Sequence, residues 1–300
     1  MTQYSLRPFH DALYNYYCEF DAPALMARFQ QADLKSEPGV IRNFLGARVQ
    51  PAVHPELLNA RQGTVEGLPI PGNWHADIAE WASALKSVEM AHDTYRILEL
   101  GCGWGCWITN MGVAARSRGL NVELVGIDGD LGHLEKARAT LALNGFSDRS
   151  YRLVHGLASH VPGQAIFPRS APGEVNYGNS AKPLPVTRGP AEQETYSGGQ
   201  ILDCYSIAQL SDEAVLDLLH VDIQGAECSV LIGSFSHLTR YVRRVLVGTH
   251  SRSIEGELMS HFLANGWRLE MERPAIAPLQ GGLPVTLIDG VQMWANMNHV

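Results

Sequence analysis

A glycine-rich segment that joins an apolar strand to a helix constrains the fold of this chain most strongly. Tyr95–Leu100 is apolar and ends at the run Gly-Cys-Gly-Trp-Gly, and Trp107–Arg118 then shows helical spacing. Glycines at alternate positions let the backbone turn tightly and approach a ligand closely. The first N–H groups of the helix that follows are free to bind it. The segment therefore predicts a small-molecule site at the end of a strand.

The elements around this segment alternate between strand and helix. Glu123–Asp128 is a second expected strand, Leu131–Asn144 a second helix that Gly145 ends, and Tyr151–His155 a third strand. This β-α-β-α-β order predicts a parallel sheet with right-handed crossovers. Two further strands are expected at Asp217–Asp222 and Arg243–Gly248, and a helix at Glu255–Asn265.

The flanking segments have a different character. Residues 1–90 contain the helical patterns Ala22–Gln31 and Ala76–Met90 and few strand signals. Residues 160–200 are rich in Pro, Gly, Ser and Asn, which predicts a long loop on the substrate side. The tail predicts a β-hairpin in which Asp289-Gly290 turns between residues 285–288 and 291–295. We therefore divide the chain into an N-terminal helical or lid region, 1–90, and a ligand-binding domain, 91–300.

The glycine segment does not match a dinucleotide-binding loop. That fingerprint has glycine at the first, third and sixth positions, and the sixth position counted from Gly101 is Cys106. Glu99 stands directly before the loop, where a carboxylate is unfavourable beside a pyrophosphate. A carboxylate is favourable beside a sulfonium or an amino group, and S-adenosylmethionine (SAM) carries both. We therefore predict SAM as the cofactor.

A second acid, Asp128, ends the next strand, where a carboxylate can accept hydrogen bonds from both hydroxyls of a ribose. His155-Gly156-Leu157-Ala158 ends the third strand, where the adenine is expected to pass. The expected cofactor-binding residues are Glu99, Gly101, Cys102, Gly103, Trp104, Gly105, Asp128, Gly129, Ala158 and Asp222.

The segment Asp222-Ile223-Gln224-Gly225-Ala226-Glu227 follows a further apolar strand. Together with Leu141-Ala142-Leu143-Asn144-Gly145 and Ile201-Leu202-Asp203, it resembles the FkbM family of SAM-dependent methyltransferases over roughly residues 95–270. That family has Asp-x-Glu-Gly-Ala-Glu at this strand end, so Gln224 replaces its middle acid. His220 stands where a lysine is frequent in the family.

The resemblance implies a fold and an activity. The fold is a Rossmann-like class I methyltransferase domain, with a mostly parallel seven-stranded sheet, helices on both faces and an antiparallel seventh strand. The activity is O-methylation, often of sugars or secondary metabolites. We expect a small-molecule or carbohydrate acceptor. Two alternatives stay open: a SAM-binding protein without turnover, and an NAD(P)-dependent oxidoreductase.

Methylation of a hydroxyl requires a base that removes its proton. His250, just after the strand Arg243–Gly248, is the first candidate, and Asp222 is the second. Burial as a core histidine is the preferred interpretation of His220. A divalent cation such as magnesium, held by His220, Asp222, Glu227 and His250, is not favoured because only two of these are carboxylates. We assign no metal ligands.

Charge and composition limit the partners and the compartment. The net charge of −8 gives no basic footprint for a nucleic acid. No apolar run approaches the roughly 20 residues that span a bilayer. The N-terminus does not resemble a signal peptide, and the cysteines, an odd five, are scattered as in reduced proteins. We expect a cytoplasmic protein, and a homo-oligomer stays open.

Overall fold

The computed structural model describes residues 13–169, 176–183 and 199–299. Its α-helices are α2 (Ala22–Phe29), α3 (Pro55–Leu58), α4 (Ile78–Glu89), α5 (Cys106–Ser117), α6 (Leu131–Leu143), α7 (Ile207–Ser211), α8 (Glu227–Gly233), α9 (Phe235–Tyr241) and α10 (Arg252–Ala264), with 3-10 turns at Pro51–Val53 and Asn59–Arg61. The main sheet contains β1 (Tyr17–Cys18), β4 (Thr94–Leu100), β5 (Asn121–Asp128), β6 (Tyr151–His155), β11 (Leu218–Val221), β12 (Arg244–Thr249), β13 (Arg268–Arg273) and β16 (Gly290–Ala295). Smaller sheets contain β2 (Ile41–Arg42), β3 (Arg48–Val49), β7 (Leu157–Ala158), β8 (Gly163–Pro168), β9 (Lys182–Pro183), β10 (Gly199–Tyr205), β14 (Leu279–Gln280) and β15 (Leu283–Pro284).

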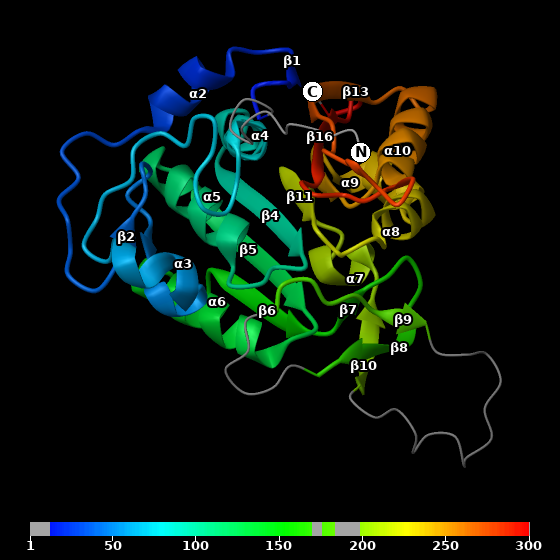
Figure 1. The fold of residues 1–300 in the computed structure, drawn as a ribbon, viewed down its shortest axis with the longest axis horizontal. Coiled ribbons are helices and arrows are strands. Elements are labelled where there is room, and N and C mark those ends of the chain that lie inside the picture. The colour runs from blue at the N-terminus through cyan, green and yellow to red at the C-terminus, as the bar shows by residue number, and fades with distance from the viewer. Residues whose placement is uncertain (1–12, 170–175, 184–198, 300) are drawn as a thin grey trace.

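The main sheet has the order β1-β13-β16-β12-β11-β4-β5-β6 (Figure 1). Strands β12, β11, β4, β5 and β6 pair in parallel, whereas β16 is antiparallel to both β12 and β13. The expected Rossmann-like architecture and its antiparallel strand are confirmed. The expected count of seven strands is wrong, because β1 adds an eighth strand beside β13. A two-residue strand has no periodicity that a sequence could reveal.

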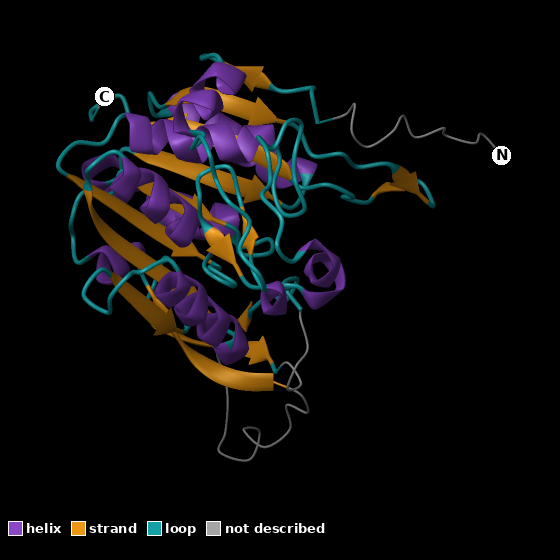
Figure 2. Cartoon of the chain, turned by 90° about the vertical axis from the view of Figure 1, so that its left-hand side faces the viewer, coloured by secondary structure: helices purple, strands orange, loops and turns teal. Residues whose placement is uncertain are grey.

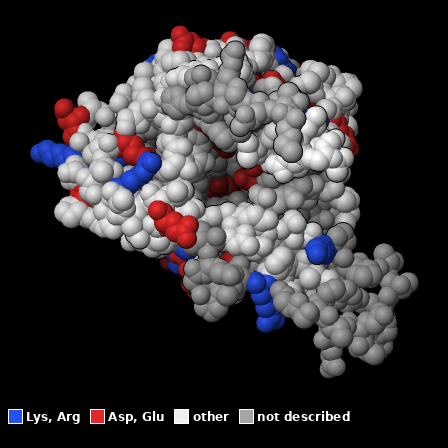
Figure 3. All heavy atoms as spheres, in the orientation of Figure 1, with Lys and Arg blue, Asp and Glu red and all other residues white. Residues whose placement is uncertain are grey.

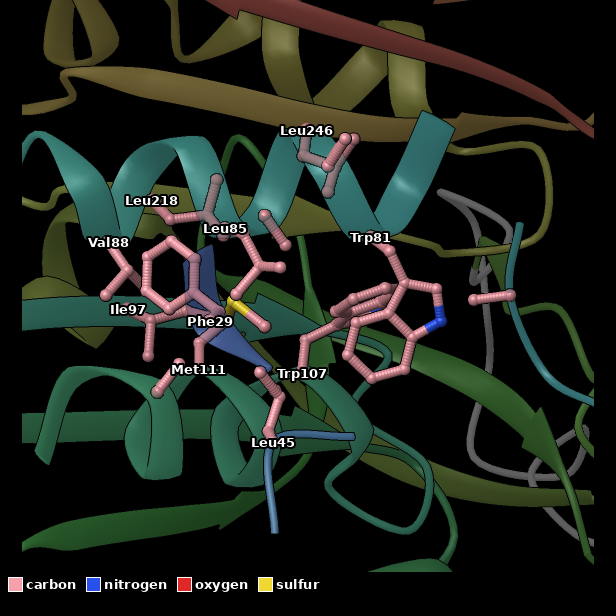
Figure 4. Close-up of a cluster of buried hydrophobic side chains, with 14 of the residues drawn as sticks. Phe29, Leu45, Trp81, Leu85, Val88, Ile97, Trp107, Met111, Leu218 and Leu246 are labelled. Atoms are coloured by element: carbon pink, nitrogen blue, oxygen red, sulfur yellow. The ribbon is translucent and has the colours of Figure 1, made fainter. Parts of the chain in front are cut away.

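Helices cover both faces of this sheet because successive strand residues point in opposite directions. On β4, Ile97 packs into one hydrophobic cluster, with α2, α4 and α5, and Leu98 into another, with α7, α8 and α10. Figure 2 shows the strands as a layer between helices, and Figure 4 shows Trp81 and Leu85 of α4 packed toward Trp107 and Met111 of α5. The core therefore lies in two layers, and α4 belongs to the first.

Two expectations for irregular segments are wrong. The expected loop 160–200 contains β8, which pairs with β10 over Gly163–Pro168, and the short β9; its residues 170–175 and 184–198 lie outside the described residues. The tail forms no hairpin at Asp289-Gly290. Instead β16 inserts between β12 and β13, and all six of its residues are buried. A strand covered on both faces has no polar alternation to identify its neighbours.

The N-terminal region holds the expected helices but also β1, β2 and β3. Phe29 and Phe44 from this region pack in the same cluster as Trp81 and Ile97. The boundary at residue 90 stays a prediction. Within the described ranges, none of the helices is both long enough and apolar enough to cross a membrane.

Candidate functional site

A cavity of about 340 Å³ opens where the parallel strands β4, β5 and β11 end. Ligands of open α/β sheets bind outside these carboxyl ends, and the volume lies in the range of small-molecule sites, about 300–1,000 Å³. Figure 3 shows this side of the molecule hollowed, with acidic atoms inside the hollow. The following predicted cofactor residues line the cavity: Glu99, Gly101, Cys102, Gly103, Trp104, Asp128, Gly129, Ala158 and Asp222. Gly105 does not line the cavity. It is the N-cap residue of α5 and has a left-handed backbone conformation.

The glycine loop passes very close to the end of β11. Gly101 has φ +76°, and a Cβ atom at this position would lie 1.9 Å from the carbonyl oxygen of Asp222. Only glycine combines a left-handed backbone with such an approach. The glycine loop and the segment that begins at Asp222 lie about 120 residues apart in sequence, and their backbones are in close contact at the cavity.

Glu99 is 2% exposed and binds the start of α5. Its carboxylate accepts the N–H groups of Trp107 at 3.2 Å and Ile108 at 2.9 Å. Gly105, the N-cap residue, has no side chain to do this, and an anion is favourable at a helix N-terminus. Burial nevertheless raises the pKa of Glu99 to about 8. The two hydrogen bonds lower this pKa, and the negative charges of Asp222 and Asp128 raise it further.

Asp128 connects the glycine loop to the loop before α6. It accepts the N–H of Gly103 at 2.8 Å and the N–H of Asp130 at 2.8 Å. The ring Nδ1 of His133 lies 3.2 Å from the same carboxylate. These partners fix the carboxylate at the cavity wall, at the end of β5, where the sequence predicts it.

The cavity wall is acidic. Its carboxylates are those of Glu80, Glu99, Asp128 and Asp222, and none of the described residues that line it is a lysine or an arginine. The imidazole of His220 is 4% exposed, and its Nδ1 has no hydrogen-bond partner. An unpaired buried polar group is unfavourable without a ligand or water. This wall suits a cationic ligand with hydrogen-bonding groups and is unfavourable for a pyrophosphate.

His250 contacts Asp222 outside the cavity wall rather than lining it. Its Nε2 lies 3.2 Å from Asp222, and its Nδ1 lies 2.9 Å from the fully buried Glu227. Burial opposes the charge of His250, but the two carboxylates raise its pKa to about 10. Burial alone would raise the pKa of Asp222, but the contact with His250 lowers it below its usual value. A histidine that is already protonated cannot remove a proton, so this geometry favours Asp222 over His250 as a base.

We expect the stabilising effect of His250 to decrease as the pH rises. Its folded-state pKa of about 10 lies above the ordinary 6.5, so its contribution is complete below about pH 6.5 and is lost toward pH 10. Urea unfolding of the native chain and of His250→Gln at pH 6.5, 8 and 9.5 measures the difference in unfolding free energy. The difference should shrink at each step. A difference that grows with pH would contradict the charged pairing.

Aromatic side chains form the outer wall of the cavity. The rings of Trp74 and Trp104 stack with centroids 5.6 Å apart, and His75 packs edge-on to both. Burial lowers the pKa of His75 to about 3, so this ring is neutral. Rigid aromatic faces of this kind suit an uncharged ring or sugar.

Among the cavity residues that carry no prediction from the sequence are three aromatic rings. Tyr177 stacks on His133 with centroids 4.4 Å apart and donates a hydrogen bond to the carbonyl of Val53 at 2.7 Å. Phe167 of β8 lies against Gly129. Tyr177 and Phe167 belong to the segment expected to be a loop, and no local motif marks them. His133 follows Asp128 by five residues in the first turn of α6, a spacing that could have identified it.

Across the described ranges, no group of three or more His, Cys, Asp or Glu side chains is arranged to hold a metal ion. A divalent cation, which the sequence leaves possible but does not favour, stays untested.

This sheet order, its single antiparallel inner strand and an acid-flanked glycine loop at the strand ends define the Rossmann-like methyltransferase class. Residues 89–271 match the model of the methyltransferase FkbM domain. The chain is also 46% identical over 272 residues to a putative methyltransferase of Jannaschia sp. (strain CCS1), covering 90% of this chain and 96% of that one. The chain therefore belongs to the FkbM methyltransferase family.

Solved structures give a weaker likeness. The FkbM methyltransferase of Methylobacillus flagellatus KT is 11% identical, with a TM-score of 0.46, and the match covers 72% of this chain and 54% of that one. A precorrin-6y C5,15-methyltransferase of Geobacter metallireducens GS-15 is 10% identical, with a TM-score of 0.40 and coverage of 71% and 85%.

Proposed function

We propose that this chain transfers the methyl group of SAM to a hydroxyl of a small metabolite, sugar or glycan. The observation that carries the proposal is the glycine-lined cavity with four acidic side chains and no lysine or arginine among its described residues. SAM has a positive sulfonium and an ammonium group, which this wall favours. NAD(P) has a pyrophosphate, which the wall disfavours. The loop also has Cys106 where the dinucleotide fingerprint requires its third glycine.

The proposed cofactor contacts follow the strand ends. Asp128 accepts hydrogen bonds from the ribose hydroxyls, Gly129 and Ala158 lie along the nucleoside, and the loop from Gly101 lies along the methionine part. Glu99 keeps the loop and α5 in place through its bonds to the helix N-terminus. When bound, SAM would supply an activated methyl group, which the acceptor oxygen takes as the carbon–sulfur bond breaks and S-adenosylhomocysteine leaves.

The proposed acceptor lies against the aromatic wall. Trp74 and Trp104 offer flat apolar faces, and the absence of cationic side chains among the described lining residues favours an uncharged acceptor. Asp222 lines the cavity, and we assign it the acceptor's proton because His250, with its raised pKa, is already protonated. His250 is then a positioning residue, since it contacts Asp222 and is anchored by Glu227. We retain a small-molecule or carbohydrate partner and a cytoplasmic location as proposals.

Asp128→Ala is expected to weaken SAM binding by about 10- to 100-fold, because hydrogen bonds to a charged acceptor contribute about 1.5–3 kcal/mol. Calorimetric titration of the native chain and the variant with SAM measures the loss, and titration with NADH tests the competing cofactor. Binding of NADH without SAM would reject the methyltransferase proposal. Native binding of SAM would justify screening hydroxylated acceptors, with and without magnesium, by product mass.

Asp212→Ala is a matched control for this substitution. Asp212 is an exposed aspartate whose ion pair with Arg152 lies on the surface, and it does not line the cavity. Its variant should bind SAM with native affinity. A similar loss in both variants would indicate a general effect of charge rather than a ribose contact.

A further inference from the structure

Glu80 differs from the other three carboxylates of the cavity in its partners. Glu99 accepts two helix N–H groups, Asp128 accepts two backbone N–H groups and contacts His133, and Asp222 pairs with His250. One oxygen of Glu80 accepts the N–H of Asp77 at 3.1 Å, as part of the capping box that begins α4. Glu80 forms no ion pair with any residue that the structure describes.

The surroundings of Glu80 disfavour its negative charge. Burial and the charge of Asp77 raise the pKa of Glu80 to about 8, with a smaller contribution of the same sign from Asp222. Arg273 lowers the pKa but is itself paired with Asp77. The titratable and charged groups around Glu80, on its own helix start and on the elements packed against it, are His75, Asp77, Glu99, Cys106, His220, Asp222 and Arg273. Of these only Arg273 is cationic near neutral pH, because burial lowers the pKa values of His75 and His220 to about 3 and 4.

The donor and the spent product of a SAM-dependent transfer differ in charge. SAM has a sulfonium, whereas S-adenosylhomocysteine (SAH) has a neutral thioether in its place. A carboxylate near the sulfur, in a cavity partly shielded from water, distinguishes the two by charge alone. We propose that Glu80 is the residue by which this cavity prefers the charged donor over the neutral product. The inference rests on the proposed use of SAM and adds the specificity of the same site.

The proton balance of this step is simple. Near pH 7 most of the free protein carries a proton on Glu80. Binding of the cation stabilises the carboxylate form, so this proton leaves to the solvent, and no covalent bond to carbon or sulfur changes. The neutral thioether gives no such stabilisation, so Glu80 keeps its proton. Preference for SAM therefore rises with pH through about pH 8, where half of Glu80 is ionised in the free protein, and levels off above it.

Calorimetric titration of the native chain with SAM and with SAH at pH 6.5 and 8.5 tests the proposal. The ratio of the two dissociation constants should shift toward SAM by up to about 25-fold between these values, because with a pKa of about 8 the ionised fraction of Glu80 rises from roughly 3% to roughly 76%. Titrations at pH 7 in phosphate and in Tris, which differ in ionisation enthalpy, count the protons released. SAM should release more protons than SAH.

Glu80→Gln supplies the decisive comparison. Glutamine keeps an oxygen that accepts the N–H of Asp77, so the capping box is retained, but it carries no charge and does not titrate. In this variant the preference for SAM and the difference in proton release should both fall, and what remains measures Glu99, whose pKa is also about 8, and the ligands' own amino groups. Glu89→Gln, at the other end of α4 and outside the cavity, should behave as the native chain.

The outcomes separate the two proposals. If the native chain binds neither SAM nor SAH, the proposed function fails. If it binds both, but Glu80→Gln keeps the native preference and the native proton release, only the role of Glu80 is overturned. Equal effects of Glu80→Gln and Glu89→Gln would also overturn it, because the effect would then come from the helix rather than the cavity.

Discussion

Gly101→Ala should abolish SAM binding and lower the free energy of unfolding by roughly 2–5 kcal/mol. The added Cβ would lie 1.9 Å from the carbonyl oxygen of Asp222, a backbone atom that cannot rotate away. A left-handed backbone costs about 1–2 kcal/mol at an alanine, and overpacking adds about 1–3 kcal/mol. Relief of the clash must separate the loop from the end of β11, which widens the cavity wall at its closest point. Urea unfolding and calorimetric titration with SAM measure the two effects.

Gly119→Ala is a matched control for this substitution. Gly119 has φ +79°, nearly the same backbone conformation as Gly101, but a Cβ atom there meets nothing within 4 Å. This variant should lose only the conformational part, about 1–2 kcal/mol, and should bind SAM with native affinity. Equal losses in the two variants would show that the close approach of loop and strand does not hold the site together.

Asp77→Ala should destabilise the chain by about 3–5 kcal/mol and also weaken the site. Asp77 and Arg273 form an ion pair in which both side chains are less than 10% exposed. Removal of one partner leaves the other charge buried and unpaired. Asp77 also caps α4 through the N–H groups of Ala79 and Glu80. Because Trp74, His75 and Glu80 line the cavity from the start of α4, loosening this turn should reduce SAM affinity as well.

Glu123→Ala provides the contrast. Its partner Arg96 is 33% exposed and Glu123 itself 54%, so the pair lies in water and should contribute less than about 1 kcal/mol. Urea unfolding of the three chains under identical conditions gives both differences. If Asp77→Ala cost no more than Glu123→Ala, the buried pair would not support α4 as the geometry indicates.

Local pattern was sufficient for the part of the fold that builds the cofactor loop. The predicted strand Tyr95–Leu100 begins one residue after β4 and ends at the same residue. The predicted helix Trp107–Arg118 begins and ends one residue after α5. Tight turns and helix stops depend on residues that adjoin them in sequence, such as Gly101 and Gly145. The same reasoning failed for β1 and β16, whose places in the sheet depend on partners far away in the chain.

The candidate site divides in the same way. The acids Glu99 and Asp128 are recognisable because each ends an apolar strand beside glycine, and both lie at the cavity. The protonation of His250 is not recognisable in this way, since it follows from carboxylates 23 and 28 residues earlier that only the folded sheet brings within 3.2 Å.

The sequence by itself determined the alternating strands and helices from Tyr95 to His155, the glycine loop, and the two acids that flank it, because these features rest on spacing between near neighbours. The tertiary structure alone decided which charges are compensated. Asp77 pairs with Arg273 at a separation of 196 residues, Asp222 pairs with His250, and Glu80 forms no ion pair among the described residues. Electrostatic energy depends on distance and burial in space rather than on position along the chain, and so the unpaired state of Glu80 arises only on folding.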